Sequence, residues 1–131
     1  MPVAAAALCL ALLGNPPVRV EVDRFTLSWT HSIEKVEWQE DWAVGPEGLR
    51  VLEARVKGSG VGMEPAEGAV LRDGWWAYVP QLPPQRQVML ATSGFTADHT
   101  LCAAGKCEPL AKWVRRPAGD ESPVEMAACA P

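Results

Sequence analysis

The segment THSIEKVEWQEDW, residues 30–42, concentrates the side chains that are best suited to chemistry. It holds a histidine, a serine, four acidic residues and two tryptophans in thirteen positions. A histidine beside a serine could activate the hydroxyl as a nucleophile. On a β-strand, however, neighbouring side chains point to opposite faces, so His31 cannot easily take the proton of Ser32. The sequence also contains no G-x-S-x-G elbow. We therefore predict that the protein is not an enzyme.

The residues around this segment alternate between apolar and polar, which is typical of β-strands. The apolar residues are odd-numbered from Phe25 to Ile33 and even-numbered from Val36 to Val44. Either a β-bulge in one long strand or a tight hairpin at Glu34-Lys35 would produce this change of phase. We favour the hairpin. Its expected cross-strand pairs are Ile33 with Val36, His31 with Trp38, Trp29 with Glu40, and Leu27 with Trp42.

Two polar residues, His31 and Glu40, interrupt the apolar face of this hairpin. They would be diagonal neighbours, within side-chain reach of one another. Because buried polar groups need partners, we expect a mainly structural hydrogen bond between them. The alternative is a site for a ligand or a partner, walled by tryptophans. The candidate residues for such a site are His31, Ser32, Glu34, Glu40, Trp29, Trp38 and Trp42.

The rest of the chain also has the pattern of an all-β protein. Twelve prolines and eleven glycines separate short apolar runs, and such spacing is typical of sandwiches and barrels. Further hairpins are expected around Asp73-Gly74 and between Cys102 and Cys107. We predict a single small antiparallel sandwich or barrel-like domain with about seven to nine short strands.

The N-terminal segment MPVAAAALCLALLG differs in composition from the rest of the chain, because it is almost wholly apolar and the first charge is Arg19. It is shorter than the roughly 20 residues that span a bilayer as a helix, but it fits the apolar region of a signal peptide. We expect residues 1–15 to be a signal peptide or short hydrophobic leader and residues 16–131 to be the all-β domain. The alternative is a buried N-terminal helix. The leader predicts an extracytoplasmic, periplasmic protein, soluble or held at the membrane by that leader.

Charge and cysteine content narrow the possible partners. A net charge of −4 with scattered basic residues argues against nucleic acid as a partner.

With Cys9 in the leader, three cysteines remain, and Cys102 and Cys107 would face each other across a hairpin as a disulfide. Cys129 is then free or competes for Cys107. A single pair of cysteines does not predict a zinc site, and we expect no metal and no cofactor.

Four stretches of the chain resemble a known family. FTLSWTHSIEKVEWQEDW, ARVKGSGVGMEP, DGWW and HTLCAAGKCEPL are similar to sequences of the bacterial DUF1850 family, and the resemblance covers roughly residues 18–113. Its most specific part is the His-Ser pair followed by an acid, matched here by His31, Ser32 and Glu40. The resemblance implies a small extracytoplasmic protein of unknown function, often encoded beside TAXI-type TRAP transporters.

The leader, the cysteine hairpin and the resemblance lead to a first hypothesis of function, and the tryptophan-walled pair of His31 and Glu40 leads to an alternative. The first is an exported, non-enzymatic all-β module that assists a TRAP-type solute transporter by contacting its subunits at the membrane. The alternative is a periplasmic small-molecule binding protein that uses the tryptophan-walled His31 and Glu40 pocket. The sequence does not identify a ligand.

Overall fold

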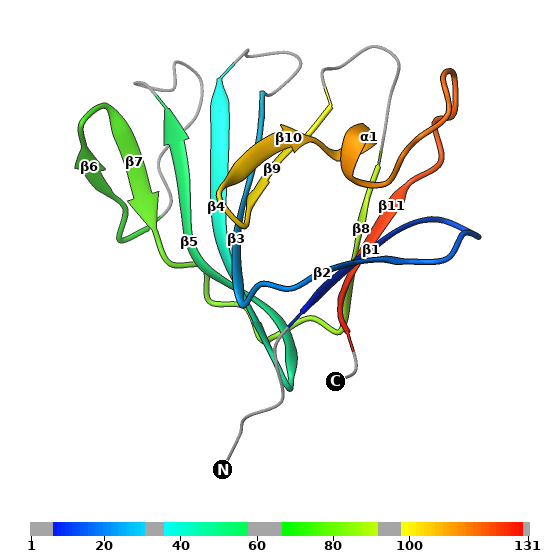
Figure 1. Ribbon diagram of the computed structural model, residues 1–131. Helices are drawn as coiled ribbons and strands as arrows, with labels where there is room; N and C mark the ends of the chain where they lie inside the picture. The colour runs from blue at the N-terminus through cyan, green and yellow to red at the C-terminus, as the bar shows by residue number, and fades with distance from the viewer. Residues whose placement is uncertain (1–6, 31–35, 58–66, 92–97, 130–131) are drawn as a thin grey trace.

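The chain folds almost entirely into β-strands, as Figure 1 shows. The computed structural model describes residues 7–30, 36–57, 67–91 and 98–129. These residues form eleven strands and one short helix, so the prediction of an all-β protein is confirmed. The strands outnumber the expected seven to nine because several of them have only three or four residues.

Seven of the strands form the larger sheet, which is antiparallel throughout. In spatial order these are β10 (Lys106–Pro109), β9 (Thr100–Ala103), β3 (Arg24–Thr30), β4 (Glu37–Gly45), β5 (Gly48–Lys57), β7 (Trp75–Tyr78) and β6 (Val70–Arg72).

The other four strands form a smaller antiparallel sheet that draws on both ends of the chain. In spatial order these are β2 (Val18–Val20), β1 (Leu8–Leu12), β11 (Val124–Ala128) and β8 (Gln87–Leu90). The helix α1 (Leu110–Trp113) directly follows β10.

The core lies between the two sheets. The smaller sheet contributes fully buried side chains such as Leu10 and Met126, and the larger sheet contributes Leu27, Leu49 and Leu101. In Figure 1 the smaller sheet lies to the right, and the β6–β7 hairpin extends to the left, on the far side of the larger sheet. The two layers therefore form a sandwich whose core includes residues of β3, β4, β5 and β9 and leaves the exposed strand β6 outside.

The apolar N-terminal segment is part of this sandwich. Residues 8–12 form β1, which pairs with β2 on one side and β11 on the other, and Leu8 and Leu10 have no exposed surface. The boundary expected at residue 15 therefore does not match the fold, and the alternative of an N-terminal helix does not match it either. A run of alternate buried leucines has the same composition as a leader, which is why the two could not be separated by composition. Cleavage of a leader stays a prediction, and it would remove β1 together with Cys9.

The described part of the chain contains no helix with the length and apolar character needed to cross a membrane.

Residues 24–43 form a hairpin and not one bulged strand, but its register differs from the expected one by two residues. β3 pairs with β4 so that Trp29 faces Trp38, Leu27 faces Glu40 and Phe25 faces Trp42. The expected pairs of Trp29 with Glu40 and Leu27 with Trp42 are wrong. The observed register stacks aromatic rings across the strands, with the rings of Phe25 and Trp42 5.9 Å apart. A slip of two residues keeps every side chain on its own face. The predicted division of the side chains between the two faces is therefore unchanged.

The turn expected at Glu34-Lys35 lies outside the described residues. The last described pair of the hairpin is Thr30 with Glu37.

All four cysteines form disulfides. The predicted bond between Cys102 and Cys107 is confirmed, and it joins the directly paired strands β9 and β10. The prediction that Cys129 is free or competes for Cys107 is wrong, because Cys129 is bonded to Cys9. The Cys9–Cys129 bond closes nearly the whole chain, because its two cysteines are separated by 120 positions in the sequence.

The two disulfides should stabilise the fold by different amounts. In the chain-entropy description, removing Cys9–Cys129 by a double substitution to serine costs about 5 kcal/mol, whereas removing Cys102–Cys107 costs about 2 kcal/mol, because the second loop is much shorter. Denaturant unfolding of the oxidised variants measures both. Equal losses would show that loop length does not control their contributions, and non-reducing peptide mapping checks the pairing itself.

Candidate functional site

A stacked pair of tryptophans lies on the inner face of the larger sheet. The Trp29 and Trp38 rings are 6.1 Å apart and nearly parallel, with an interplanar angle of 9°. Both side chains are only partly buried. The His99 ring lies tilted against Trp29, with 5.4 Å between the ring centres. Burial lowers the pKa of His99, and the charge of Asp98 opposes that shift, so the cluster favours a neutral imidazole.

Glu40 lies on the same face, two residues beyond Trp38. Burial raises the pKa of Glu40, and a hydrogen bond from the indole Nε1 of Trp42 to its carboxylate, at 3.2 Å, partly offsets this. In the sheet register Glu40 faces Ala54 on β5, which in turn faces Tyr78 on β7. Burial and the charge of Glu40 raise the pKa of Tyr78. A carboxyl group and a phenol thus share one row across the sheet.

The indole Nε1 of Trp38 is buried and has no hydrogen-bond partner in the described structure. An unsatisfied buried donor costs about 1–3 kcal/mol, so native proteins seldom leave one without a reason. The inner face therefore carries a spare donor at Trp38 and a carboxyl of raised pKa at Glu40, and both groups are suited to polar contact with a bound molecule.

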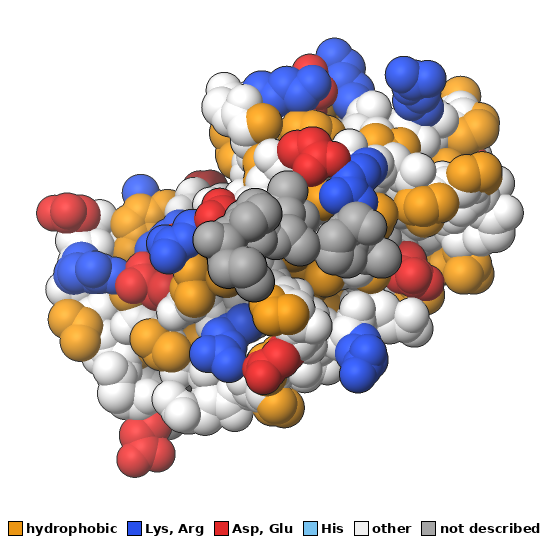
Figure 2. All heavy atoms as spheres, turned by 60° about the horizontal axis from the view of Figure 1, so that its bottom comes forward, with side chains coloured by type: hydrophobic (Ala, Val, Ile, Leu, Met, Phe, Trp, Pro, Cys, Tyr) orange, Lys and Arg blue, Asp and Glu red, His pale blue; other side chains and the backbone are white. Residues whose placement is uncertain are grey.

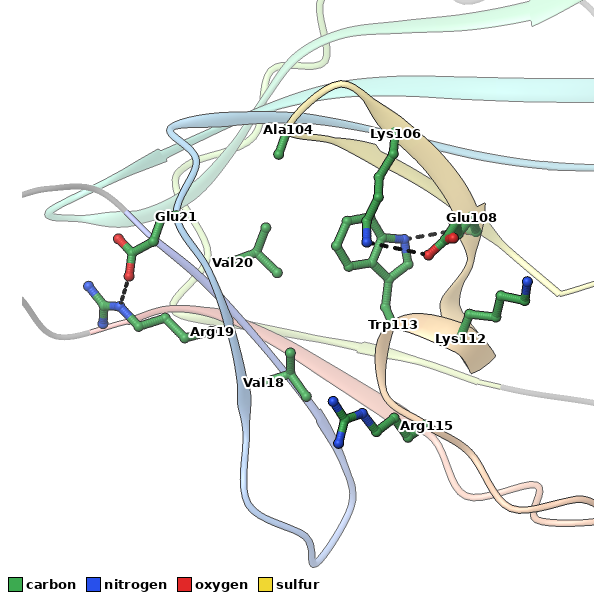
Figure 3. A pocket seen from close by; sticks show the side chains of 10 residues that line it. All are labelled: Val18, Arg19, Val20, Glu21, Ala104, Lys106, Glu108, Lys112, Trp113 and Arg115. Atoms are coloured by element: carbon green, nitrogen blue, oxygen red, sulfur yellow. Dashed lines mark hydrogen bonds and ion pairs between the residues drawn. The ribbon is translucent and has the colours of Figure 1, made fainter.

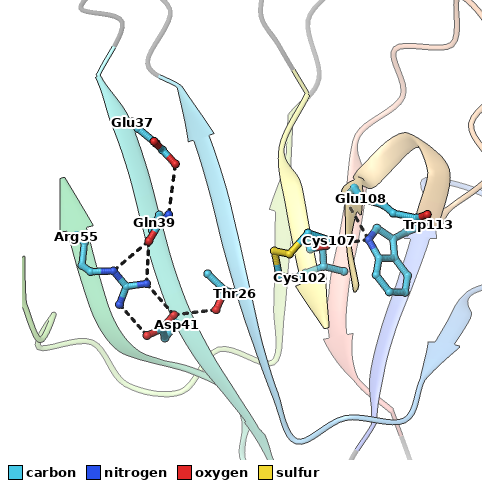
Figure 4. The surroundings of a disulfide bond; sticks show 10 residues. Thr26, Glu37, Gln39, Asp41, Arg55, Cys102, Cys107, Glu108 and Trp113 are labelled. Atoms are coloured by element: carbon cyan, nitrogen blue, oxygen red, sulfur yellow. Dashed lines mark hydrogen bonds and ion pairs between the residues drawn. A yellow bond between two sulfur atoms is a disulfide. The ribbon is translucent and has the colours of Figure 1, made fainter. Parts of the chain in front are cut away.

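The outer face of the same strands carries a continuous polar network, shown in Figure 4. At its centre the Arg55 guanidinium donates to both oxygens of Asp41, at 2.7 and 3.0 Å, and to the amide oxygen of Gln39. Asp41 also accepts from the Thr26 hydroxyl at 2.8 Å. The hydrogen bond from Arg55 lowers the pKa of Asp41.

This network connects four strands, because Glu53 accepts from Arg55 on its own strand and from Arg72 on β6. Arg55 and Arg72 are each paired with a carboxylate, and Asp41 and Glu53 are each paired with an arginine. These ion pairs and hydrogen bonds link neighbouring strands of the sheet, and the charges at the centre of the outer face compensate one another.

The structure brings together four of the residues proposed from the sequence, as two pairs. Trp29 stacks on Trp38, and Trp42 bonds to Glu40. Trp42 is only 6% exposed and stacks on Phe25, so it is a core residue that holds the carboxylate and not a wall of an open site. His31, Ser32 and Glu34 lie outside the described residues, and the expected hydrogen bond between His31 and Glu40 stays a prediction.

Two members of this face, His99 and Tyr78, were not predicted from the sequence. His99 precedes β9, which lies next to β3 in the sheet, and Tyr78 lies in the same cross-strand row as Glu40, with Ala54 of β5 between them. Both depend on strand order, for which a single sequence holds no local signal.

The described residues contain no group of three or more His, Cys, Asp or Glu side chains that could hold a metal ion.

The fold and site together define a disulfide-bonded β-sandwich domain whose inner face carries tryptophans and a carboxyl group. A family model described as a domain of unknown function, DUF1850, matches residues 25–110, and the chain belongs to this family. The matched range includes nearly the whole of the larger sheet and leaves β1, β2 and β11 outside. Comparisons with curated proteins and with solved structures gave no significant match.

The raised pKa of Glu40 predicts a pH dependence of stability. The folded state favours the protonated carboxyl, so its contribution is fully present below the pKa of the unfolded chain and is lost as the pH rises through the folded value. The wild type should therefore lose unfolding free energy relative to Glu40→Gln as the pH rises above 4.5, the ordinary value for a glutamate. Glutamine keeps an oxygen that can accept from Trp42.

Glu37→Gln is the matched control, since Glu37 is exposed on the opposite face of the same strand. Denaturant unfolding at several pH values gives the comparison. Parallel curves for the wild type and Glu40→Gln would contradict the inference that burial raises the pKa of Glu40.

Proposed function

We propose that this DUF1850 protein is an extracytoplasmic, non-enzymatic module that assists a TRAP-type solute transporter by contacting its subunits. The observation that carries the proposal is the partly exposed Trp29–Trp38 stack with His99 against it. Aromatic side chains are enriched at protein–protein interfaces, where a few rigid anchors supply most of the binding energy. The setting beside a transporter comes from the family resemblance.

The disulfides support an extracytoplasmic location. Disulfides persist in oxidising compartments and are rare in the cytosol. In this chain all four cysteines are paired, and one bond joins the first strand to the residue just after the last. A fold closed in this way is suited to the periplasm or the cell surface.

The surroundings of the titratable groups support a non-enzymatic role. Glu40 bonds to an indole nitrogen, and the His99 ring packs on an indole ring. Among the described residues, neither group forms a hydrogen bond to a serine, threonine or cysteine side chain that it could activate. The site is therefore better suited to binding than to nucleophilic catalysis.

The surface supports a protein partner in preference to nucleic acid. On the face shown in Figure 2, Lys and Arg side chains are interspersed with Asp and Glu, with apolar side chains between them. Nucleic-acid binding requires a continuous basic surface to neutralise phosphates.

The alternative function, binding of a small molecule at the inner face, is favoured by one observation. The buried donor of Trp38 lacks a partner in the described structure, and the carboxyl group of Glu40 lies on the same face. A ligand with both an acceptor and a donor could satisfy these groups.

Co-purification tests the leading proposal. The wild-type protein should be recovered from detergent extracts together with the membrane or binding subunits of the TRAP-type transporter whose genes lie beside its own. Replacing both tryptophans, Trp29→Ala with Trp38→Ala, should weaken this association roughly thirtyfold, as expected for the loss of interface anchors. Trp75→Ala is the matched control, because Trp75 lies on the same sheet but on the opposite face.

Circular dichroism and thermal melting establish that each variant is folded. No association of the wild type, against a positive control, would exclude the transporter role. Equal association of all variants would exclude the tryptophan pair as the contact.

A thermal-shift screen of candidate solutes tests the alternative function, small-molecule binding. A ligand that binds the folded state raises the melting temperature of the protein by mass action. A shift that Glu40→Gln abolishes, without loss of co-purification, would assign the inner face to a small molecule. The absence of any shift at millimolar solute would reject the alternative.

A further inference from the structure

A groove lies where the edges of the two sheets meet. β2 is the edge strand of the smaller sheet and β10 the edge strand of the larger one, and the helix α1 and the residue Arg115 close the space between them. The groove has a volume of about 480 Å³, which is in the range of small-molecule sites, about 300–1,000 Å³. Figure 3 shows the side chains that line it.

The floor of the groove is apolar and held in place. Val18 and Val20, two residues apart on β2, point to the same side of the strand. The Trp113 ring is fixed because its Nε1 donates to the backbone oxygens of Leu101, at 3.0 Å, and Glu108, at 3.2 Å. The polar edge of the indole is thus satisfied by the protein, and the ring offers a flat apolar surface.

The rim of the groove is basic, although the protein as a whole is acidic. Four cationic side chains line the groove beside only two carboxylates, in a chain of net charge −4. The lining cations are Arg19, Lys106, Lys112 and Arg115, and the carboxylates are Glu21 and Glu108.

The two carboxylates are already engaged. Glu21 pairs with Arg19, and Glu108 pairs with Lys106 at 3.7 Å. Lys106 also lies over the Trp113 ring, with 4.7 Å from its Nζ to the ring centre. Within the described part of the chain, Arg115 forms no ion pair. Figure 3 shows its guanidinium extending toward Val18, so an uncompensated cation lies beside the apolar floor.

The backbone at Arg115 gives independent support. Arg115 has φ +53°, a left-handed conformation that is uncommon for any residue except glycine. It ends α1, where the amide of Arg116 bonds to the carbonyl of Ala111 at 2.8 Å, as in a Schellman cap. Glycine is the favoured residue at this position. A strained arginine in place of glycine is the kind of outlier that occurs where a side chain is used for binding.

We propose that this groove binds a small amphiphilic anion, with its carboxylate or phosphate group at Arg115 and a flat apolar body against Trp113 and Val18. Charge-assisted hydrogen bonds from the guanidinium hold the anionic group, and burial of the apolar body provides the remaining affinity. The proposal does not rest on the transporter role, since the groove and the Trp29–Trp38 stack share no residue.

Calorimetric titration with matched probes tests the proposal. The wild type should bind 2-naphthoate or 2-naphthyl phosphate at least tenfold more tightly than the neutral 2-naphthamide or than acetate, which lacks the apolar body. The tighter of the two anionic probes identifies the head group. Equal binding of naphthoate and naphthamide would overturn the proposal, because the cations would then have no role.

Arg115→Gly is the decisive variant. It should melt at or above the temperature of the wild type, because glycine accepts the left-handed conformation, and it should bind the anionic probe roughly tenfold more weakly. Lys57→Gln is the control for loss of a cation outside the groove. The Nζ of Lys57 lies 4.9 Å from the centre of the Trp75 ring, as Lys106 lies over Trp113 inside the groove. Its affinity should equal that of the wild type.

Unchanged binding by Arg115→Gly would overturn the proposal, as would binding to vesicles of anionic lipid without binding to the free probes. The Trp29→Ala with Trp38→Ala variant should retain probe binding. This result separates failure of the groove from failure of the proposed transporter contact.

Discussion

The pairing of the first strand with the last is the interaction on which the rest of the structure depends. β1 and β11 pair over five residues each, and Leu8, Leu10, Val124 and Met126 are completely buried between the sheets. Burial of each such side chain contributes roughly 1.5–3 kcal/mol. Without this pair the smaller sheet would lose its two central strands, and the inner face of the larger sheet, including Leu27, would be exposed to water. The terminal disulfide holds the same two strands together, so packing and covalent bonding act at one place.

The larger sheet divides its chemistry between two faces. The outer face satisfies its charges internally, through Arg55 and its partners. The inner face is apolar wherever the smaller sheet covers it and becomes aromatic and polar at Trp29, Trp38 and Glu40. Glu40 departs from this apolar pattern, and the hydrogen bond from Trp42 compensates its burial only in part. A carboxyl group is thus retained at a cost in burial, on the same face as an indole donor that has no partner in the described structure.

The edges of the sandwich are where binding chemistry can reach solvent. A sandwich of unequal sheets cannot close all of its edges, and the short strands β2 and β10 leave a groove between them. The hydrogen bonds of Trp113 to two backbone carbonyls hold its ring in the floor of this groove, and the Trp42 indole, stacked on Phe25, donates a hydrogen bond to the carboxylate of Glu40. In both places a buried or anchored aromatic ring positions a neighbouring charged group.

Local properties of the sequence determined the all-β class, the two faces of the strands in residues 24–43 and the short-range disulfide, because alternation and loop length are visible within a few residues. They favoured a hairpin for residues 24–43 without excluding a single bulged strand, and the pairing of β3 with β4 showed the hairpin. The register of that hairpin was not determined, since a slip of two residues leaves the pattern of faces unchanged. The role of the N-terminal leucines was not determined either, because a leader and a buried strand have the same composition. Only the tertiary structure decided that Cys9 meets Cys129, that His99 packs on Trp29, and that Tyr78 lies in the row of Glu40. Each of these contacts joins segments far apart in the chain, and the order of strands in a sheet is set by packing of the whole core and not by any local signal.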